Sequence, residues 1–510
     1  MTLNRSMLVA VIGAGAMGAG IAEVAALAGH RVRLQDAVPG AAERARAGIA
    51  DRLRRAIEKG NRTQEEAAGV IARIEPAATL DALKDCGLVI EAIVEDLDEK
   101  RTLFRALEPL VAPDAVLATN TSSLSVTAIA GALVKPERCL GLHFFNPAPL
   151  MALVEVVSGL ATDESLAADA VSLMGAWGKQ PVRCRSTPGF IVNRIARPYY
   201  GEAVRLYEEG VADPATIDAL MTAAGGFRLG PFGLMDLVGL DVNLAANEGV
   251  WRGLGLDPRY APTVIQREMV AGGRLGRKSG RGYYDYAPGA AIPAPRVAPA
   301  APPPKTVIAR GEFDASETIL VRAQGVGLSA THMAGPAAFV IDGHAVALTD
   351  GRPAAIRFAE DFGRPSVLFD YARDFATTKR LALAQAPQAE PAALEAATGF
   401  FQALGIEVSI VGDSPGLIVL RTLAMTANEA FAALEAGVCA PADLDLAMQK
   451  GTNWPEGPFA WASRVGLSTL LGVMDRLGES FRSDRYRAAP LLRRAAQAGV
   501  SLKNALERFA

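Results

Sequence analysis

The chain has 510 residues, half of them hydrophobic and 21% charged, which is typical of a soluble globular protein with several domains. Its formal net charge of −3 gives no reason to expect a nucleic-acid or anionic-membrane partner. Four scattered cysteines without a CxxC pair argue against a zinc site or a disulfide framework, and with no signal-peptide or membrane-spanning pattern they predict a cytoplasmic protein.

The first predicted element is a buried strand at residues 8–12, which runs directly into a glycine-rich turn and a helix. The turn reads G-x-G-x-x-G, the pattern that places the pyrophosphate of a dinucleotide at the start of a helix. In this pattern the first glycine permits a tight turn, the second lets the backbone approach the pyrophosphate, and the third lets helix and strand pack closely. The predicted cofactor-binding residues of the turn are Gly13, Gly15, Ala16, Met17 and Gly18.

A second strand at residues 31–35 ends at Asp36, which lies 18 residues beyond Gly18. A carboxylate near this spacing bonds the ribose 2′-OH in dinucleotide-binding folds. Because a 2′-phosphate would meet a negative charge there, the sequence predicts NAD rather than NADP as the cofactor. The alternative is that the glycines mark only a loop, and the two flanking strands and the acid argue against it.

The chain then alternates between helical and apolar extended segments. Residues 39–78 are a predicted helix because apolar side chains recur at four-residue steps, and residues 98–110 form another. Buried strands are predicted at residues 88–93, 115–120, 139–145 and 153–157. The alternation predicts an α/β Rossmann domain with a doubly wound, mainly parallel sheet, which binds ligands beyond the carboxyl ends of its strands.

Beyond Pro188-Gly189 the alternation stops, and long helical stretches lead to extended chain from residue 272. A proline- and alanine-rich linker and a small α/β segment without a glycine fingerprint follow. Strands in that segment are predicted at residues 319–321, 338–341 and 367–369. The sequence thus predicts five parts. They are an NAD-binding Rossmann domain (1–186), an all-α domain (187–286), a linker (287–305), a reduced Rossmann-like domain (306–411) and a second all-α domain (412–510).

Residues from about 400 onward repeat an earlier part of the chain at a constant offset of 227 residues. Pro188-Gly189 matches Pro415-Gly416, and Gly230-Pro231-Phe232 matches Gly457-Pro458-Phe459, without a gap. The repeat predicts an internal duplication in which the second α/β unit is shortened. The second copy keeps glycines and prolines but loses the polar residues His143, Glu155 and Asn193, which map to Asp370, Ala382 and Leu420. Divergence of the strands leaves the first two mappings uncertain.

Two of the lost polar residues form the candidate catalytic pair. His143 ends an apolar strand, and Glu155 lies in the apolar run at 153–157, where a carboxylate is costly to bury unless it is paired. Glu155 would orient His143 and raise its basicity, while His143 removes a hydroxyl proton as hydride leaves the carbon. The alternative is a core histidine satisfied by a carboxylate, and the NAD fingerprint argues against that alternative.

Ser122 follows a predicted strand in a polar turn, and Asn193 lies in an otherwise apolar helix. Because asparagine is a poor helix former, a role for Asn193 in facing a ligand is attractive. Each residue also has a structural alternative: Ser122 as a turn or N-cap residue, and Asn193 as the donor of a hydrogen bond between helices. The sequence alone leaves these alternatives open.

Several motifs of the first half resemble those of the L-3-hydroxyacyl-CoA dehydrogenases. They occur in order at residues 13–18, 93–95, 120–124, 141–147, 154–157 and 186–194, and the similarity covers residues 7–286. The resemblance implies that His143 and Glu155 are the catalytic dyad. It also implies that Ser122 and Asn193 contact the substrate oxygen and the nicotinamide region.

The same resemblance implies NAD contacts for Glu95, Lys100 and Asn146, and a CoA contact for Lys59. Arg52 stands where the animal enzymes carry a serine near CoA, so the resemblance does not carry that contact over.

Within the family, the duplicated length and the segments 177–183 and 197–200 resemble a bacterial branch of phenylacetate breakdown. The substrate of that branch is 3-hydroxyadipyl-CoA, and relatives act on 3-hydroxybutyryl-CoA. The resemblance implies NAD-dependent oxidation of a (3S)-3-hydroxyacyl-CoA to the 3-oxoacyl-CoA. The alternatives are a dehydrogenase of a free hydroxy acid and a non-catalytic NAD-binding structural protein. The intact polar set of the first copy argues against the structural protein, and the acyl chain length stays open.

The helical domain of this family buries an apolar face against the same domain of another subunit, and this chain carries its own second copy. We therefore predict that the two helical domains pack together within one chain about a pseudo-twofold axis. Further association of whole chains into a homo-oligomer through other surfaces is compatible with the sequence.

Overall fold

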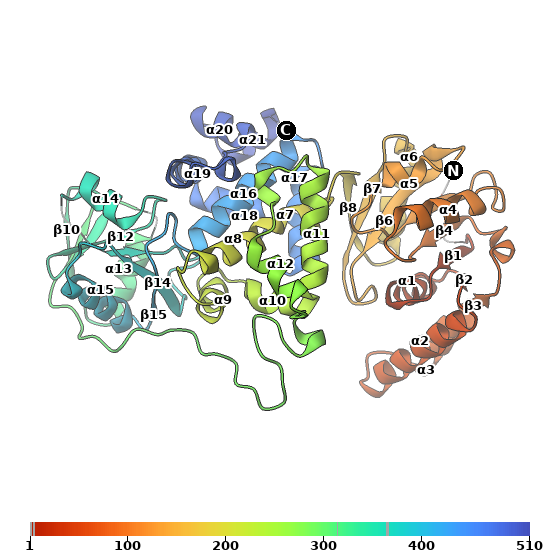
Figure 1. Ribbon diagram of the computed structural model, residues 1–510, viewed down its shortest axis with the longest axis horizontal. Helices are drawn as coiled ribbons and strands as arrows, with labels where there is room; N and C mark the ends of the chain where they lie inside the picture. The colour runs from red at the N-terminus through yellow and green to blue at the C-terminus, as the bar shows by residue number, and fades with distance from the viewer. Residues whose placement is uncertain (1–2, 4–5, 314, 364–366, 510) are drawn as a thin grey trace. The chain divides into compact units, whose positions relative to one another are not determined.

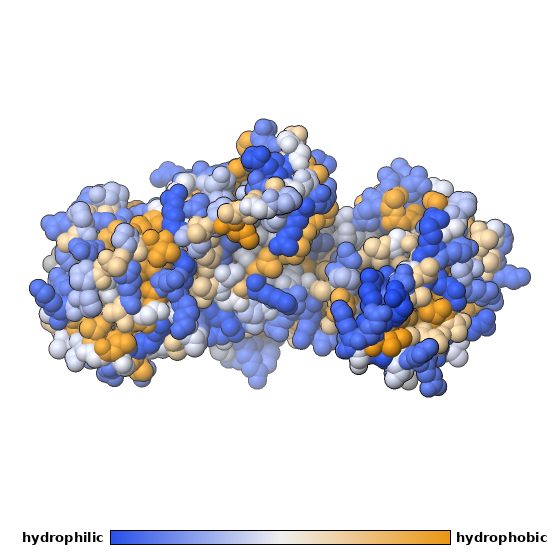
Figure 2. Space-filling model, turned by 90° about the horizontal axis from the view of Figure 1, so that it is seen from below, coloured by the Kyte–Doolittle hydropathy of each residue, from blue (hydrophilic) through white to orange (hydrophobic). Residues whose placement is uncertain are grey.

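The computed structural model describes residues 3, 6–313, 315–363 and 367–509, and it divides into two compact units (Figure 1). Residues 1–194 and 436–452 belong to the first unit, and residues 195–435 and 453–510 to the second. Among the described residues, no helix is long and apolar enough to cross a membrane. Figure 2 shows hydrophilic residues interspersed with apolar ones over the face in view.

An eight-stranded sheet forms the centre of the first unit, in the order β3-β2-β1-β4-β5-β6-β7-β8. Its strands pair in parallel except for the antiparallel pair β6 and β7. The strands are β1 (Val9–Ile12), β2 (Val32–Gln35), β3 (Ile74–Ala77), β4 (Leu88–Glu91), β5 (Val116–Thr119), β6 (Cys139–Phe144), β7 (Leu153–Ser158) and β8 (Gln180–Arg185). The predicted doubly wound, mainly parallel sheet is confirmed, and β8 is an additional strand that the sequence pattern did not reveal.

Helices cover both faces of this sheet, with one hydrophobic cluster on each side. One cluster packs the sheet against α1 (Ala16–Leu27), α2 (Ala41–Glu58), α3 (Gln64–Arg73) and α6 (Glu164–Ala176). The other packs it against α4 (Leu97–Leu107), α5 (Val126–Ala130) and the 3-10 turn η1 (Leu80–Leu83). A second 3-10 turn, η2 (Pro136–Arg138), precedes β6, and the short helix α7 (Val192–Ile195) contains the boundary between the two units, after Arg194.

The single helix predicted over residues 39–78 is wrong, because the structure has two helices and a strand there. The second helix, α3, starts at a capping box in which the Thr63 side chain accepts from the Glu66 amide and the Glu66 side chain accepts from the Thr63 amide. That box is a helix start in the middle of the predicted helix. Residues 74–77 then pair with β2 as strand β3, a tertiary contact that local periodicity does not reveal.

The second unit begins with the first helical region and ends with the second. The first region comprises α8 (Arg197–Glu208), α9 (Pro214–Ala223), α10 (Pro231–Val238), α11 (Leu240–Gly253), η3 (Pro258–Tyr260), α12 (Val264–Ala271) and η4 (Arg277–Ser279). The second comprises α16 (Val419–Glu435), α18 (Pro458–Val465), α19 (Leu467–Phe481), η5 (Asp484–Tyr486), α20 (Pro490–Gln497) and α21 (Leu502–Phe509). The helix between α16 and α18, α17 (Pro441–Thr452), belongs to the first unit.

Between the two helical regions lies a seven-stranded sheet in the order β10-β9-β11-β12-β13-β14-β15. Its strands are β9 (Val307–Arg310), β10 (Ala330–Met333), β11 (Ala338–Ile341), β12 (His344–Leu348), β13 (Val367–Phe369), β14 (Arg380–Gln385) and β15 (Glu407–Ile410), with helices α13 (Ser316–Gly325), α14 (Ala354–Asp361) and α15 (Pro391–Ala403). Residues 338–341 and 367–369 are strands as predicted. Residues 319–321 are not, because they lie in α13. A run of three apolar residues does not distinguish a strand from a buried helix turn.

The two helical regions pack against each other, as predicted, along α8 and α16. Ion pairs cross this interface in both directions. Arg485 of the second copy bonds Glu202 of the first, and Arg259 of the first copy bonds Glu429 of the second. Glu429 lies 227 residues after Glu202, and both arginines lie in the corresponding turns η5 and η3. Reciprocal contacts between equivalent surfaces are the signature of a twofold interface, so the pseudo-twofold arrangement is confirmed.

Candidate active site

The glycine turn after β1 shows which of its glycines the fold requires. A Cβ added at Gly13 would lie 2.4 Å from the Ala92 carbonyl oxygen, and one at Gly18 would lie 1.7 Å from the Gly13 carbonyl oxygen. At Gly15 an added Cβ would meet nothing within 4 Å. Packing therefore explains Gly13 and Gly18 but not Gly15, which stands at the N-cap of α1 without a side-chain cap. These features fit the close approach of a pyrophosphate to the helix N-terminus.

Asp36 lies directly after β2 and beside this turn. Its carboxylate accepts hydrogen bonds from the Ala14 amide at 2.6 Å and the Val38 amide at 2.8 Å. β1 and β2 pair in parallel with Ile12 opposite Gln35, so the turn and the acid lie at the same edge of the sheet. The carboxylate is held where the ribose of a dinucleotide is expected.

We expect Asp36→Ser to raise the KM for NAD by about 10- to 100-fold, because a hydrogen bond to a charged group contributes roughly 1.5–3 kcal/mol. The preference for NAD over NADP should narrow, since the negative charge beside the 2′ position is gone. Initial rates with each cofactor measure both effects. Equal use of the two cofactors by the wild-type protein would show that Asp36 does not face the ribose.

His143 and Glu155 face each other across the antiparallel strands β6 and β7. The Nδ1 atom of His143 lies 2.6 Å from Oε2 of Glu155, and both side chains are buried. The other carboxylate oxygen of Glu155 accepts the Ile191 and Val192 amides, each at 3.0 Å. Because a carboxylate only accepts, it holds the proton of the neutral imidazole on Nδ1 and leaves Nε2 to take a proton from a ligand.

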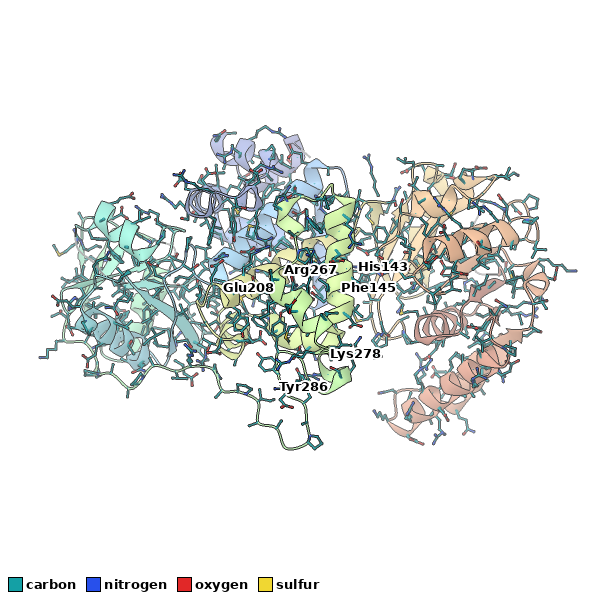
Figure 3. The ribbon with its side chains drawn as sticks, in the orientation of Figure 1. His143, Phe145, Glu208, Arg267, Lys278 and Tyr286 are labelled. Carbon is teal, nitrogen blue, oxygen red and sulfur yellow. The ribbon has the colours of Figure 1, made fainter. Side chains whose placement is uncertain are left out.

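Two aromatic rings lie near the imidazole of His143. The Phe145 ring lies 4.4 Å from the His143 ring centre and the Phe190 ring 5.9 Å from it. Figure 3 labels His143 and Phe145, which lie next to each other in the first unit. Exclusion of water by these rings strengthens the electrostatic pairing of His143 with Glu155.

Glu95 holds the polar turn that carries Ser122. Its Oε1 atom accepts from the Thr121 hydroxyl at 2.7 Å and from the Ser122 and Ser123 amides at 2.8 and 2.9 Å. Lys100 lies 3.3 Å from its other oxygen. Burial acts to raise the pKa of Glu95, but Lys100 and these hydrogen bonds outweigh it and lower the pKa below its usual value. Glu95 is therefore a charged acceptor in this turn.

Lys100 is almost completely buried, and its ammonium group lies 2.5 Å from Glu91 as well as near Glu95. Glu91 ends strand β4 and also accepts from Thr119 at 2.7 Å. Sequence reasoning did not single out Glu91, although a carboxylate within an apolar strand was the signal that pointed to Glu155. The lysine thus joins the end of β4 to the turn that carries Ser122.

Asn193 lies between the turn that carries Ser122 and the residues that bond Glu155. The side-chain amide of Asn193 donates to the Ser122 carbonyl oxygen at 3.2 Å. The preceding residue, Val192, donates its backbone amide to Glu155. The segment 191–193 therefore contacts both Glu155 and the turn that carries Ser122. Asn120, which the sequence did not single out, ties the end of β5 to β6 by accepting the Phe144 amide at 2.8 Å.

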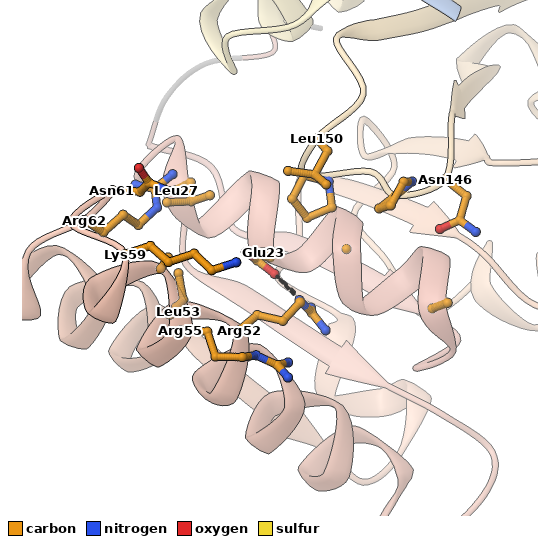
Figure 4. Close-up of a pocket in the computed structure, with 15 residues that line it drawn as sticks. Glu23, Leu27, Arg52, Leu53, Arg55, Lys59, Asn61, Arg62, Asn146 and Leu150 are labelled. Carbon is orange, nitrogen blue, oxygen red and sulfur yellow. Dashed lines mark hydrogen bonds and ion pairs between the residues drawn. The ribbon is translucent and has the colours of Figure 1, made fainter. Parts of the chain in front are cut away.

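A cavity of about 600 Å³ opens between α1, α2 and the loop after β6 (Figure 4). Its lining is apolar at Leu27, Leu53 and Leu150. The polar and charged side chains that line it are Glu23, Arg52, Arg55, Lys59, Asn61, Arg62 and Asn146. Two of these are already paired, because Arg52 donates to Glu23 at 2.8 Å. Lys59 and Asn146, for which the family resemblance implies contacts to CoA and NAD, thus border one cavity.

The second copy retains the framework of this site without its chemistry. Asp370 follows β13 and its amide donates to the carbonyl of Ala382 on the antiparallel strand β14, so the two residues correspond to His143 and Glu155. The uncertain 227-residue mapping is thereby confirmed. The Asp370 carboxylate accepts the amides of Ile418, Val419 and Leu420 at 2.9, 2.7 and 3.2 Å, and burial raises its pKa to about 6. The link between sheet and helix persists, whereas the histidine does not.

Comparison with known proteins gives matches along most of the chain. The NAD-binding domain of 3-hydroxyacyl-CoA dehydrogenase matches residues 8–187, and the C-terminal domain of the same enzymes matches both 189–286 and 416–510. The reduced Rossmann-fold domain of 3-hydroxybutyryl-CoA dehydrogenase matches residues 346–415. The double match of the C-terminal domain confirms the internal duplication.

Individual relatives agree with these matches. The chain is 42% identical to 3-hydroxyadipyl-CoA dehydrogenase of Escherichia coli over 96% of its own length and 97% of that protein. It is 42% identical to human mitochondrial hydroxyacyl-coenzyme A dehydrogenase over 54% of its length and 90% of that protein. The crystal structure of 3-hydroxybutyryl-CoA dehydrogenase from E. coli K12 has a TM-score of 0.89 at 41% identity, covering 97% of this chain and 99% of that one. The chain therefore belongs to the 3-hydroxyacyl-CoA dehydrogenase family of NAD-dependent oxidoreductases.

Proposed function

We propose that this protein oxidises a (3S)-3-hydroxyacyl-CoA to the 3-oxoacyl-CoA with NAD in the cytoplasm, and that its substrate is 3-hydroxyadipyl-CoA or 3-hydroxybutyryl-CoA. The observation that carries the proposal is the buried His143–Glu155 pair at 2.6 Å, beside Ser122 and Asn193 and in the same sheet as the glycine turn. The names of the E. coli relatives support both acyl groups.

In the proposed mechanism, Nε2 of His143 takes the proton of the substrate 3-hydroxyl as hydride leaves C3. Glu155 stabilises the imidazolium that forms, and the Ile191 and Val192 amides keep its carboxylate in place. Ser122 and Asn193 orient the substrate oxygen. NAD, when bound, supplies the hydride acceptor. The fixed geometry of the pair contributes to the rate because the base is already oriented before the substrate arrives.

The substrate class is tested by steady-state kinetics with NAD and a series of 3-hydroxyacyl-CoA thioesters, including the dicarboxylic 3-hydroxyadipyl-CoA. We expect turnover of thioesters and none of the corresponding free hydroxy acids. Equal turnover of a free hydroxy acid would contradict the CoA-dependent function, and absence of turnover with every thioester would contradict the enzymatic function.

Lys59 is proposed to contact a phosphate of CoA at the rim of the cavity in Figure 4. We expect Lys59→Ala to raise the KM for the acyl-CoA by about 2- to 5-fold with little change in kcat, since an exposed ion pair contributes roughly 0.2–1 kcal/mol. Arg54→Ala is the matched control, because Arg54 lies in the last turns of α2, the helix that Lys59 caps, and pairs with Asp51 and Glu58. Equal effects of the two substitutions would refute the contact.

A further inference from the structure

A segment of the second copy folds into the first unit. Residues 436–452, which include α17, belong to the unit that carries the dyad. α17 buries Leu444, Ala447 and Met448 and packs against β7 and β8. Strand β8 lies at the end of the sheet, where backbone amides lack a neighbouring strand. This segment therefore covers the sheet edge next to the strand of Glu155.

Hydrogen bonds tie the segment to that edge. The Arg185 amide donates to the carbonyl oxygen of Val438 at 2.8 Å, and the Arg183 amide donates to the Asp443 carboxylate at 3.4 Å. Arg183 and Arg185 alternate along β8, so their amides point to the same open side of the strand. The segment thus occupies the position of a missing neighbouring strand.

The last turn of α17 lies close to β7, the strand that carries Glu155. A Cβ added at Gly451 would lie 2.6 Å from Cδ2 of Leu153 and 3.1 Å from Cγ2 of Val192. Leu153 lies on β7 two residues before Glu155, and the Val192 amide is one of the two donors that hold Glu155. A side chain at position 451 would therefore press on the side chains of two residues: one on the strand of Glu155, and one whose amide bonds the carboxylate.

The first copy offers a natural comparison. At the 227-residue offset Gly451 corresponds to Ala224, which directly follows α9. α9 packs against β14, the strand whose Ala382 corresponds to Glu155. The helix-to-strand contact is thus reciprocal, but the glycine occurs only where the strand carries the catalytic carboxylate.

We propose that Gly451 is a positioning residue for the dyad of the first copy. The second copy, although it has lost its own polar set, supplies the helix that supports β7, and Gly451 lets this helix approach without displacing Leu153 and Val192. The retained duplicate is therefore part of the active-site framework. This inference rests on the proposed catalytic role of the dyad.

The test is Gly451→Ala in the full-length protein. We expect kcat to fall by about 10- to 100-fold, the effect of a sub-ångström to ångström misplacement of a catalytic group. The KM values for NAD and acyl-CoA should stay within about 2-fold, because neither the glycine turn nor the cavity is touched. Gly175→Ala is the matched control, since Gly175 is also helical, lies in the same unit, and has open space around its Cβ position.

A second variant separates positioning from simple destabilisation. Leu153→Val removes the Cδ2 atom that an alanine at position 451 would strike, so the double variant Gly451→Ala, Leu153→Val should recover most of the lost kcat. An unchanged kcat in Gly451→Ala would overturn the proposal, and so would a loss that the double variant fails to restore. A wild-type protein without 3-hydroxyacyl-CoA turnover would instead refute the proposed function.

Discussion

Replacing His143 by glutamine is expected to lower kcat by about 10²- to 10⁴-fold, the usual contribution of a positioned general base. Glutamine can accept a hydrogen bond from the substrate hydroxyl but does not take its proton at neutral pH. NAD binding should persist, because the glycine turn and Asp36 lie at other strand ends of the sheet. Steady-state kinetics and a fluorescence titration with NAD measure the two properties separately.

The chain contains its own control for this experiment. His30 is also buried, but it bonds the Met7 carbonyl oxygen at 3.1 Å and the Trp177 indole nitrogen at 3.0 Å, both of which are structural contacts. His30→Gln should lower the midpoint of thermal unfolding while kcat stays near normal. Near-normal turnover in His143→Gln, or equal losses in the two variants, would refute the assignment of His143.

The parts of the site that could be predicted from the sequence are those with a local signal of their own. The glycine turn is recognisable because three glycines at fixed spacing join a strand to a helix. Glu155 is recognisable because a carboxylate within an apolar run needs a partner. His143, at the end of a neighbouring strand, is the available partner, and the structure places it there at 2.6 Å.

Other parts of the structure depend on contacts between distant residues. The bonds from Glu95 to the Ser122 turn and the pairing of Lys100 with Glu91 leave no pattern in sequence spacing. The same holds for α17, whose own amphipathic pattern does not indicate which sheet it covers. The boundary between α2 and α3 had a local signal in the capping box at Thr63, but the apolar periodicity on either side obscured it.

The largest stability effect is expected at Glu202, which is completely buried between the two helical copies. Its carboxylate lies 2.8 Å from Arg421 and 2.5 Å from Arg485, both in the second copy. Arg421 also bonds Glu209 at 2.7 Å, whereas Arg485 has no other carboxylate partner among the ion pairs of the described residues. Loss of the Glu202 charge would leave the Arg485 guanidinium buried without a counter-charge.

We expect Glu202→Gln to lower the free energy of unfolding by about 3–5 kcal/mol, the usual result of removing one partner from a buried ion pair. Urea unfolding followed by circular dichroism measures this difference. Glu248→Gln is the control, because Glu248 pairs with Arg252 and Arg267, whose side chains are exposed, and its loss should change stability by less than about 1 kcal/mol. Comparable losses in the two variants would show that the Glu202 cluster does not hold the helical copies together.

The same carboxylate should make the stability of this interface sensitive to acid. Burial acts to raise the pKa of Glu202, but Arg485 and Arg421 outweigh it and lower the pKa to about 2 from a usual value of 4.5. An acid whose pKa is lower in the folded state stabilises that state above its unfolded pKa and loses the effect as pH falls towards its folded pKa. The difference in unfolding free energy between wild type and Glu202→Gln should therefore be constant above about pH 5 and shrink steadily below it. Urea unfolding of both proteins from pH 7 to pH 3 measures this difference, and one that stayed constant over the whole range would mean that Glu202 is not held ionised by the two arginines.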